Sequence, residues 1–201
     1  WFESAAGFGR GMEPRRYHLT EAPDPSPLFP YKLGCYGTGA SMALNKRWLP
    51  PGWRFDEALG AGTAAGGGED LDLFLDVLML GGTLVYQPAA VCYHTHRSDE
   101  AALATQMRGY GRGLTGLLAK RMLKRPRERG LLVAKVLAGV RHALSAEFRA
   151  GDDEQPESVS PYPKSLLVSE LLGMVQGPLA YVSGVRREWR TASVHWVAPT
   201  D

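Results

Sequence analysis

The sequence is poor in cysteine and in net charge, and each shortage excludes a class of protein. Its 201 residues include two cysteines, Cys35 and Cys92, too few for a disulfide framework and without the C-x-x-C pairs of a structural zinc site. We therefore expect a chain that works in a reducing compartment. The 23 basic and 21 acidic side chains leave a formal net charge of +2, which argues against a surface devoted to nucleic acid.

Several common motifs and signals are also missing. The chain contains no P-loop and no nucleophile elbow, and Gly37-x-Gly39 lacks the strand, third glycine and downstream acid of a dinucleotide site. It opens at Trp1 without an initiator Met and shows no signal peptide, so we expect a segment upstream of it. The hydrophobic share of 44% is sufficient for a buried core, which excludes a disordered chain.

The positive charge is concentrated in one segment. Residues 108–149 carry eleven basic and two acidic side chains, a local net charge of +9, so the rest of the chain sums to −7. We place a boundary near residue 113, between a front part, residues 1–113, and a basic helical tail, residues 114–201. The tail favours an anionic membrane surface, and the alternative is a set of solvated helix faces packed on the front part.

A glycine-rich loop and an amphipathic helix form the middle of the chain. Residues 60–68 read GAGTAAGGG, a backbone that can enter places where side chains would collide. Glu69 and Asp70 follow in the first turn of the predicted helix, where carboxylates suit the positive end of the helix dipole. The apolar stripe of this helix consists of Leu71, Phe74, Leu75 and Leu78, and Gly81-Gly82 ends it.

The other elements are predicted from shorter patterns. The last apolar segment, residues 165–185, is long enough to cross a bilayer, but Glu170, Gln176 and Pro178 lie inside it, which favours a core or interfacial helix pair. We also expect an irregular stretch at 12–30, strands at 31–36, 83–86 and 89–96, a short helix at 46–49, and helices at 114–123 and 131–148.

The carboxylates after the glycine loop are the first candidates for chemistry. The loop delivers Asp70 to a helix start, where a carboxylate open on one side can act as a general base toward a hydroxyl. The alternative is that Glu69 and Asp70 are favourable first-turn residues and that Asp72 and Asp76 form a solvated face. Charge and spacing alone favour this alternative.

Two further stretches carry candidate ligands. Cys92, His94 and His96 alternate onto one face of the expected strand, where a zinc site is less plausible than one imidazole joining carboxylates around Mn²⁺ or Mg²⁺. A hydrogen-bonded strand histidine is the alternative. In QMRGYGRG, Arg108 and Arg112 lie four residues apart and fit a diphosphate, unless they form an ordinary basic helix end.

Taken in order, three stretches resemble the C-terminal half of family 2 glycosyltransferases of the GT-A fold. They are GTGASMALNKRWL, then WRFDEALGAGTAAGGGEDLDLFLDVLMLGGTLVYQPAAVCYHTHR, then QMRGYGRG, and together they cover about residues 34–113. The resemblance implies an α/β fold, namely half of a Rossmann-like nucleotide-diphospho-sugar transferase domain followed by a helical tail. It also implies an inverting transferase that moves a sugar from a nucleotide-diphosphate donor to a hydroxyl acceptor. The tail is similar to those of bacterial enzymes of cell-surface polysaccharide or glycolipid synthesis.

The resemblance implies roles for single residues. Asp70 is implied to be the base that deprotonates the acceptor hydroxyl. His94, with His96 as the less certain choice, is implied to join the family's D-x-D aspartates on a Mn²⁺ or Mg²⁺ ion that holds the diphosphate. The residues implied at the acceptor are Glu69, Gly67 and Gly68, and those implied at the donor are Gly39, Ala40, Ser41, Arg97 and Arg112.

One departure from the family concerns the metal motif. Residues 1–33 contain no D-x-D, and the triplet Asp70-Leu-Asp72 lies at a helix start, not at a strand end. We therefore expect the chain to be the acceptor-side half of a longer enzyme and to be nearly inactive alone. A saccharide or lipid-linked acceptor is expected, with no nucleic-acid partner, in the cytoplasm at the inner face of the cell membrane.

Two other functions compete with this interpretation. The first is a non-catalytic module that binds a membrane surface or a partner protein through the basic helices. The second, which ranks last, is a stand-alone metal hydrolase built on Asp70, Asp72, His94 and His96.

Overall fold

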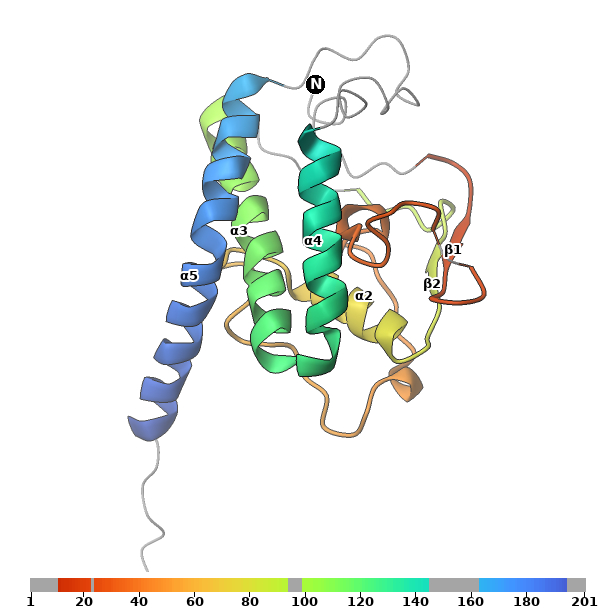
Figure 1. Cartoon of the computed structure of the whole chain (residues 1–201), viewed down its shortest axis with the longest axis horizontal. Coiled ribbons are helices and arrows are strands. Elements are labelled where there is room, and N and C mark those ends of the chain that lie inside the picture. The colour runs from red at the N-terminus through yellow and green to blue at the C-terminus, as the bar shows by residue number, and fades with distance from the viewer. Residues whose placement is uncertain (1–10, 23, 94–98, 145–162, 195–201) are drawn as a thin grey trace, which may run out of the picture.

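Helices dominate the computed structural model, which describes residues 11–22, 24–93, 99–144 and 163–194 (Figure 1). In chain order the elements are β1 (Arg15–Tyr17), the 3-10 helices η1 (Leu33–Cys35) and η2 (Lys46–Trp48), α2 (Glu69–Met79), β2 (Leu84–Tyr86), α3 (Glu100–Lys124), the 3-10 helix η3 (Pro126–Glu128), α4 (Arg129–Leu144) and α5 (Lys164–Val194).

The three long helices lie beside one another, and α2 lies between them and a small sheet (Figure 1). α3 and α5 run in the same direction and share the most extensive contact between elements, while α4 runs in the opposite direction. β1 and β2 pair antiparallel, with Arg15 opposite Tyr86. Helices and strands are thus both present, but within the described residues the sheet has two short strands, and the expected Rossmann-like parallel sheet is not evident.

The predicted amphipathic helix is confirmed as α2. It begins after Gly68, whose φ of 98° is left-handed, and it carries three acidic residues in its first turn. Phe74, Leu75 and Leu78 of the expected stripe are buried in the main core together with Tyr181 of α5. α2 therefore follows the glycine loop directly in the chain and packs in the core against α5.

Glycines allow α3 and α5 to approach at backbone distance. A Cβ atom on Gly111 would overlap the carbonyl oxygen of Glu170, and one on Gly173 would overlap the carbonyl oxygen of Arg108. Gly177, one turn beyond Gly173, would carry its Cβ 2.6 Å from the carbonyl oxygen of Arg112. No side chain fits between the two helices at these points, because small residues on facing helices let the backbones touch.

α5 continues through Pro178, so the expected pair of helices is wrong and the segment is one helix. Proline has no amide hydrogen, which leaves the carbonyl of Met174, four residues earlier, without its helical donor. The hydroxyl of Thr115 on α3 lies 2.7 Å from this carbonyl oxygen and donates to it. The neighbouring helix thus supplies the hydrogen bond that proline removes.

Replacing Gly173 with alanine tests this close packing. An alanine normally stabilises a helix relative to glycine by up to about 1 kcal/mol. Here the added methyl group meets the backbone of α3, so we expect the free energy of unfolding to fall by about 1 to 3 kcal/mol. Thermal and urea unfolding measure the change.

Gly130 of α4 provides the matched control, because a Cβ atom there would meet nothing within 4 Å. Gly130→Ala is expected to raise the free energy of unfolding by about 0.5 to 1 kcal/mol. Equal stabilisation by the two substitutions would contradict the backbone contact between α3 and α5.

The strand expected at 31–36 is wrong. This segment coils into η1, with Leu33 and Tyr36 buried three residues apart, where a strand would require alternation. The Tyr36 hydroxyl donates to the carbonyl of Pro30 at 2.6 Å, and the Tyr31 amide donates to the carbonyl of Leu28 at 2.7 Å. These turns occupy the groups that a sheet would use.

The remaining expected elements are partly confirmed. The strand at 83–86 corresponds to β2, the short helix at 46–49 to η2, and the helix at 131–148 to α4 as far as it is described. β1 interrupts the irregular stretch at 12–30, and residues 89–93 form no strand, while 94–96 lie outside the described residues. The helix at 114–123 belongs to the longer α3, which continues across residue 113, where the boundary between the two parts is predicted.

Candidate functional site

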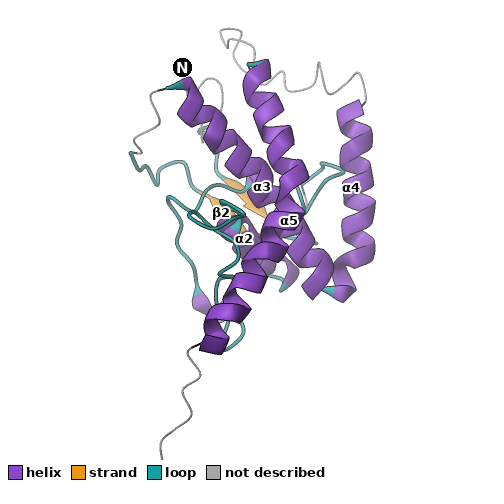
Figure 2. Cartoon of the chain, turned by 90° about the vertical axis from the view of Figure 1, so that its left-hand side faces the viewer, coloured by secondary structure: helices purple, strands orange, loops and turns teal. Residues whose placement is uncertain are grey.

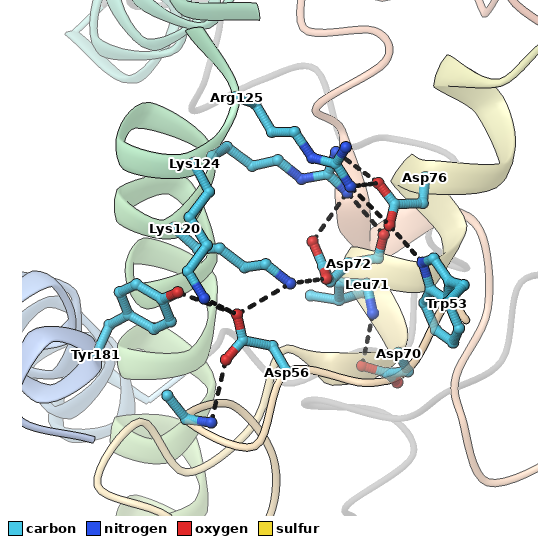
Figure 3. A network of polar contacts seen from close by, with 12 residues as sticks. Trp53, Asp56, Asp70, Leu71, Asp72, Asp76, Lys120, Lys124, Arg125 and Tyr181 are labelled. Carbon is cyan, nitrogen blue, oxygen red and sulfur yellow. Dashed lines mark hydrogen bonds and ion pairs between the residues drawn. The ribbon is translucent and has the colours of Figure 1, made fainter. Parts of the chain in front are cut away.

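Asp70 is held at the start of α2 by two backbone amides. One carboxylate oxygen accepts a hydrogen bond from the amide of Gly39 at 2.8 Å. The other accepts from the amide of Leu71 at 2.8 Å, as Figure 3 shows. The side chain is only partly buried. A Cβ atom on Gly39 would lie 2.9 Å from the Asp70 Cβ, so glycine permits the contact. The carboxylate is thus fixed in position, while the residue remains partly exposed.

Glu69 lies against the glycine-rich loop. Its carboxyl carbon would be 3.4 Å from a Cβ atom on Gly60, the first residue of the loop. Thr63 closes the loop: its hydroxyl donates to the carbonyl of Gly60 at 2.8 Å and accepts from the amide of Gly66 at 3.2 Å. The loop is therefore a turn with internal hydrogen bonds beside two adjacent carboxylates.

The same loop also packs on α3. A Cβ atom on Gly68 would lie 2.6 Å from the carbonyl oxygen of Gly113, and one on Gly66 would lie 3.3 Å from the guanidinium of Arg112. The Nε atoms of Arg108 and Arg112 are buried without a hydrogen-bond partner in the described part of the chain. Arg112 thus adjoins the loop, and no described carboxylate pairs with either arginine.

The polar face of α2 is buried against α3, so its interpretation as a solvated face is wrong. Asp72 and Asp76 are 2% and 4% exposed. Asp72 pairs with Lys120 and with Arg121, the latter at 2.8 Å (Figure 3). Asp76 pairs with Arg121 at 2.9 Å and with Arg125 at 3.0 Å. These five residues form an ionic cluster between the two helices.

Arg121 is the centre of the ionic cluster. Its side chain is fully buried, and besides the two aspartates it pairs with Glu128 of η3 at 3.3 Å. Burial alone would lower the pKa of the guanidinium, but the negative charges of Asp72, Asp76 and Glu128 raise it above its usual value. Arg121 therefore remains charged inside the fold.

Asp56 extends the cluster toward α5. Its carboxylate pairs with Lys120 at 3.2 Å and with Lys124 at 3.0 Å, and it accepts a hydrogen bond from the Tyr181 hydroxyl at 3.0 Å (Figure 3). Burial alone would raise the pKa of this carboxyl, but the Lys120 and Lys124 ammonium groups lower it below its usual value. Asp56 thereby connects the loop segment, α3 and α5.

The cluster sets the direction in which Asp70 faces. Residues on an α-helix are separated by about 100° in projection, so Asp70 lies about 200° around α2 from Asp72. Because Asp72 is fixed against α3, Asp70 must lie on the opposite side of the helix, toward Gly39. The ionic cluster therefore positions the candidate base without contacting it.

Sequence reasoning missed the cations of this cluster. The four cations follow the spacing i, i+1, i+4 and i+5, which places them on one face of a helix: Lys120, Arg121, Lys124 and Arg125. Asp72 and Asp76 are likewise four residues apart. Two helices with complementary charged faces of this kind are the signal that could have found the pairing.

The structure brings together most of the predicted site residues, and some lie outside it. Six of them are gathered around the glycine loop: Glu69, Gly67, Gly68, Asp70, Gly39 and Arg112. Ala40 and Ser41 follow Gly39 and are exposed. His94, His96 and Arg97 lie outside the described residues, so their predicted roles stay predictions.

A metal site does not form among the residues that the structure describes. No three His, Cys, Asp or Glu side chains within them come close enough to hold an ion. Asp72 in particular is occupied by two cations, which argues against the hydrolase that would use it as a ligand. The ionic cluster also borders an open cavity of about 380 Å³ lined by Arg54, Asp56 and Lys124, and Asp70 is not part of its lining.

Comparisons with known proteins give no relative. No family model matches the chain, and neither a curated protein nor a solved structure matches it. The functional interpretation therefore depends on the geometry around Asp70.

Proposed function

We propose that this chain supplies the acceptor side and the general base of an inverting, nucleotide-sugar-dependent glycosyltransferase of the GT-A type. The observation that carries the proposal is the Asp70 carboxylate, which is partly exposed and held by the Gly39 amide at 2.8 Å. A simple first-turn carboxylate needs no contact with a residue 31 positions earlier in the chain. The contact joins two of the stretches on which the family resemblance depends.

The proposed reaction uses Asp70 as the proton acceptor. The acceptor hydroxyl gives its proton to the carboxylate while its oxygen bonds to the anomeric carbon of the donor sugar. The bond between that carbon and the diphosphate oxygen breaks, and the nucleoside diphosphate leaves with the electron pair. Each carboxylate oxygen of Asp70 accepts one backbone amide, which leaves a lone pair on each for the incoming proton.

Other residues around the loop fit supporting roles. Glu69 lies beside the glycine loop and can accept hydrogen bonds from hydroxyl groups of a saccharide acceptor. Arg108 and Arg112 are cations without a described carboxylate partner, as a leaving diphosphate requires. A divalent ion, bound in part by His94, would add charge neutralisation, but no described residues gather to hold it.

The substrates and the place of action belong to the same proposal. The donor half carries the family's D-x-D motif, which residues 1–33 do not contain, so we assign that half to a segment other than these 201 residues. The resemblance of the tail to those of bacterial enzymes of cell-surface polymer synthesis supports a saccharide or lipid-linked acceptor. The enzyme would then act at the cytoplasmic face of the cell membrane.

Calorimetric titration with UDP and GDP in the presence of Mn²⁺ tests the proposal. The titration is done on this chain and on a longer polypeptide that includes the segment encoded upstream. We expect the longer polypeptide to bind one nucleotide and to transfer sugar from the matching donor, and this chain to do neither. Sugar transfer by this chain alone, or no nucleotide binding by either protein, would overturn the proposal.

A further inference from the structure

An exposed apolar stripe runs along α5. One face of this helix is buried, with Leu166 and Tyr181 fully inside and Gly173 and Gly177 against α3. The opposite face is covered by no described element, and Figure 2 looks onto it. The stripe consists of Leu167, Val168, Leu171, Leu172, Val175 and Leu179, which are 44% to 78% exposed.

The stripe has the dimensions and the flanking charges of a membrane-contacting segment. Lys164–Arg187 is a helix long enough and apolar enough to cross a bilayer. Exposed basic residues stand at both of its ends, Lys164 at the start and Arg186 at the finish. Long basic side chains at such positions reach the phosphate layer while the apolar residues between them face the acyl chains.

The packing of α5 excludes a transmembrane orientation for it. α3 follows α5 at backbone distance through Gly111 and Gly173, and α3 carries Arg108, Lys120 and Arg121. If α5 crossed the bilayer, these cations and the ionic cluster would enter the hydrocarbon region, where charged side chains are strongly unfavourable. Only the outer face of α5 is free to meet lipid.

We infer that α5 lies in the plane of an anionic membrane surface, with its apolar stripe in the headgroup and upper acyl region. Charge complementarity selects the lipid: Lys164 and Arg186 flank the stripe on α5 and are exposed, and Arg127 of η3 and Arg129 of α4 are exposed as well. Basic side chains close to an anionic leaflet are attracted to its lipid headgroups. The burial of large apolar side chains supplies the rest.

This placement deepens the proposed function, but its test does not require that function. If both hold, the Asp70 site works beside a membrane, which fits a lipid-linked acceptor. Vesicle binding reports on the membrane contact alone, since neither Asp70 nor a nucleotide takes part in it. Failure of the two proposals is therefore distinguishable.

Co-sedimentation with vesicles tests the inference. The assay compares two kinds of vesicle. One contains phosphatidylcholine with about 30% of the anionic lipid phosphatidylglycerol, and the other contains phosphatidylcholine alone. We expect the chain to bind the anionic vesicles at least about tenfold more strongly, and Val175→Glu to lower this binding by about tenfold or more. Val175 is 78% exposed, so this substitution leaves the fold intact, which circular dichroism verifies.

Val85→Glu is the matched control. Val85 is 60% exposed on β2, on the opposite side of the molecule from α5 (Figure 1). The same change of side chain there is expected to leave vesicle binding unchanged. Equal loss of binding in both variants would show a general charge effect and overturn the assignment of the stripe.

Two further readouts separate the alternative occupants of the stripe. Bound protein that remains with the vesicles after washing with 1 M salt (a Debye length of about 3 Å) and with alkaline carbonate would indicate a spanning helix and overturn the in-plane orientation. Sedimentation velocity without lipid tests a second copy of the chain. A dimer that Val175→Glu dissociates, without vesicle binding by the unsubstituted chain, would assign the stripe to that copy and overturn the inference.

Discussion

Arg121→Met is expected to lower the free energy of unfolding by about 3 to 5 kcal/mol. The guanidinium is fully buried and pairs with Asp72, Asp76 and Glu128. Methionine fills a similar volume but leaves these carboxylates in the interior with fewer cations than anions. Urea unfolding followed by tryptophan fluorescence measures the loss, and Trp53, which donates to Asp76 at 2.8 Å beside the ionic cluster, contributes to that signal.

Arg127→Met is the control for this measurement. Arg127 is exposed in η3, six positions from Arg121, so its replacement is expected to change the free energy of unfolding by no more than about 0.5 kcal/mol. A loss below about 1 kcal/mol for Arg121→Met would mean that the cluster does not hold α2 against α3.

In the enzyme that this chain is proposed to form, Asp70→Asn is expected to lower turnover by about 10²- to 10⁴-fold. An amide cannot accept the proton of the acceptor hydroxyl, whereas the size of the side chain is unchanged. The two backbone amides of Gly39 and Leu71 both need an oxygen acceptor, and asparagine offers one. The free energy of unfolding should therefore fall as well, by about 1 to 3 kcal/mol.

Donor binding distinguishes the two effects of Asp70→Asn. Calorimetric affinity for the nucleotide is expected to stay within about twofold of the original, because the base acts on the acceptor and in the transition state. Glu57→Gln, a change of the same kind at an exposed carboxylate, is expected to leave turnover unchanged. Turnover retained by Asp70→Asn would remove Asp70 as the base.

The helix that carries the candidate base could be predicted because its signals are local. A glycine loop, acidic residues and an apolar stripe follow one another within 20 residues, and α2 begins and ends where they indicate. The strand predicted at 31–36 is wrong because a short apolar run fits both a strand and a coil with buried residues three positions apart. The packing of Leu33 and Tyr36 into the core decides between the two.

The partners of α2 could not be predicted from local patterns. Asp72 and Arg121 are 49 positions apart, and the same spacing of aspartates suits a solvated face equally well until α3 is placed against it. The continuity of α5 depends in the same way on a hydroxyl from another helix, since Pro178 alone indicates a break. At the site, sequence placed Asp70 at a helix start, but only folding brings Gly39 to it.

The hydrogen bond between Tyr181 and Asp56 joins residues 125 positions apart, and it has a consequence for synthesis of the chain. When the ribosome has completed α2, α3 and α4, it has made all the carboxylates and all the cations of the ionic cluster. It has not yet made Tyr181, whose hydroxyl donates to Asp56. The glycine face of α3 is equally without its partner at that stage, because Gly173 and Gly177 follow later. The loop beside Asp70 packs on this same α3, so the nascent site gains its final support only when α5 has emerged.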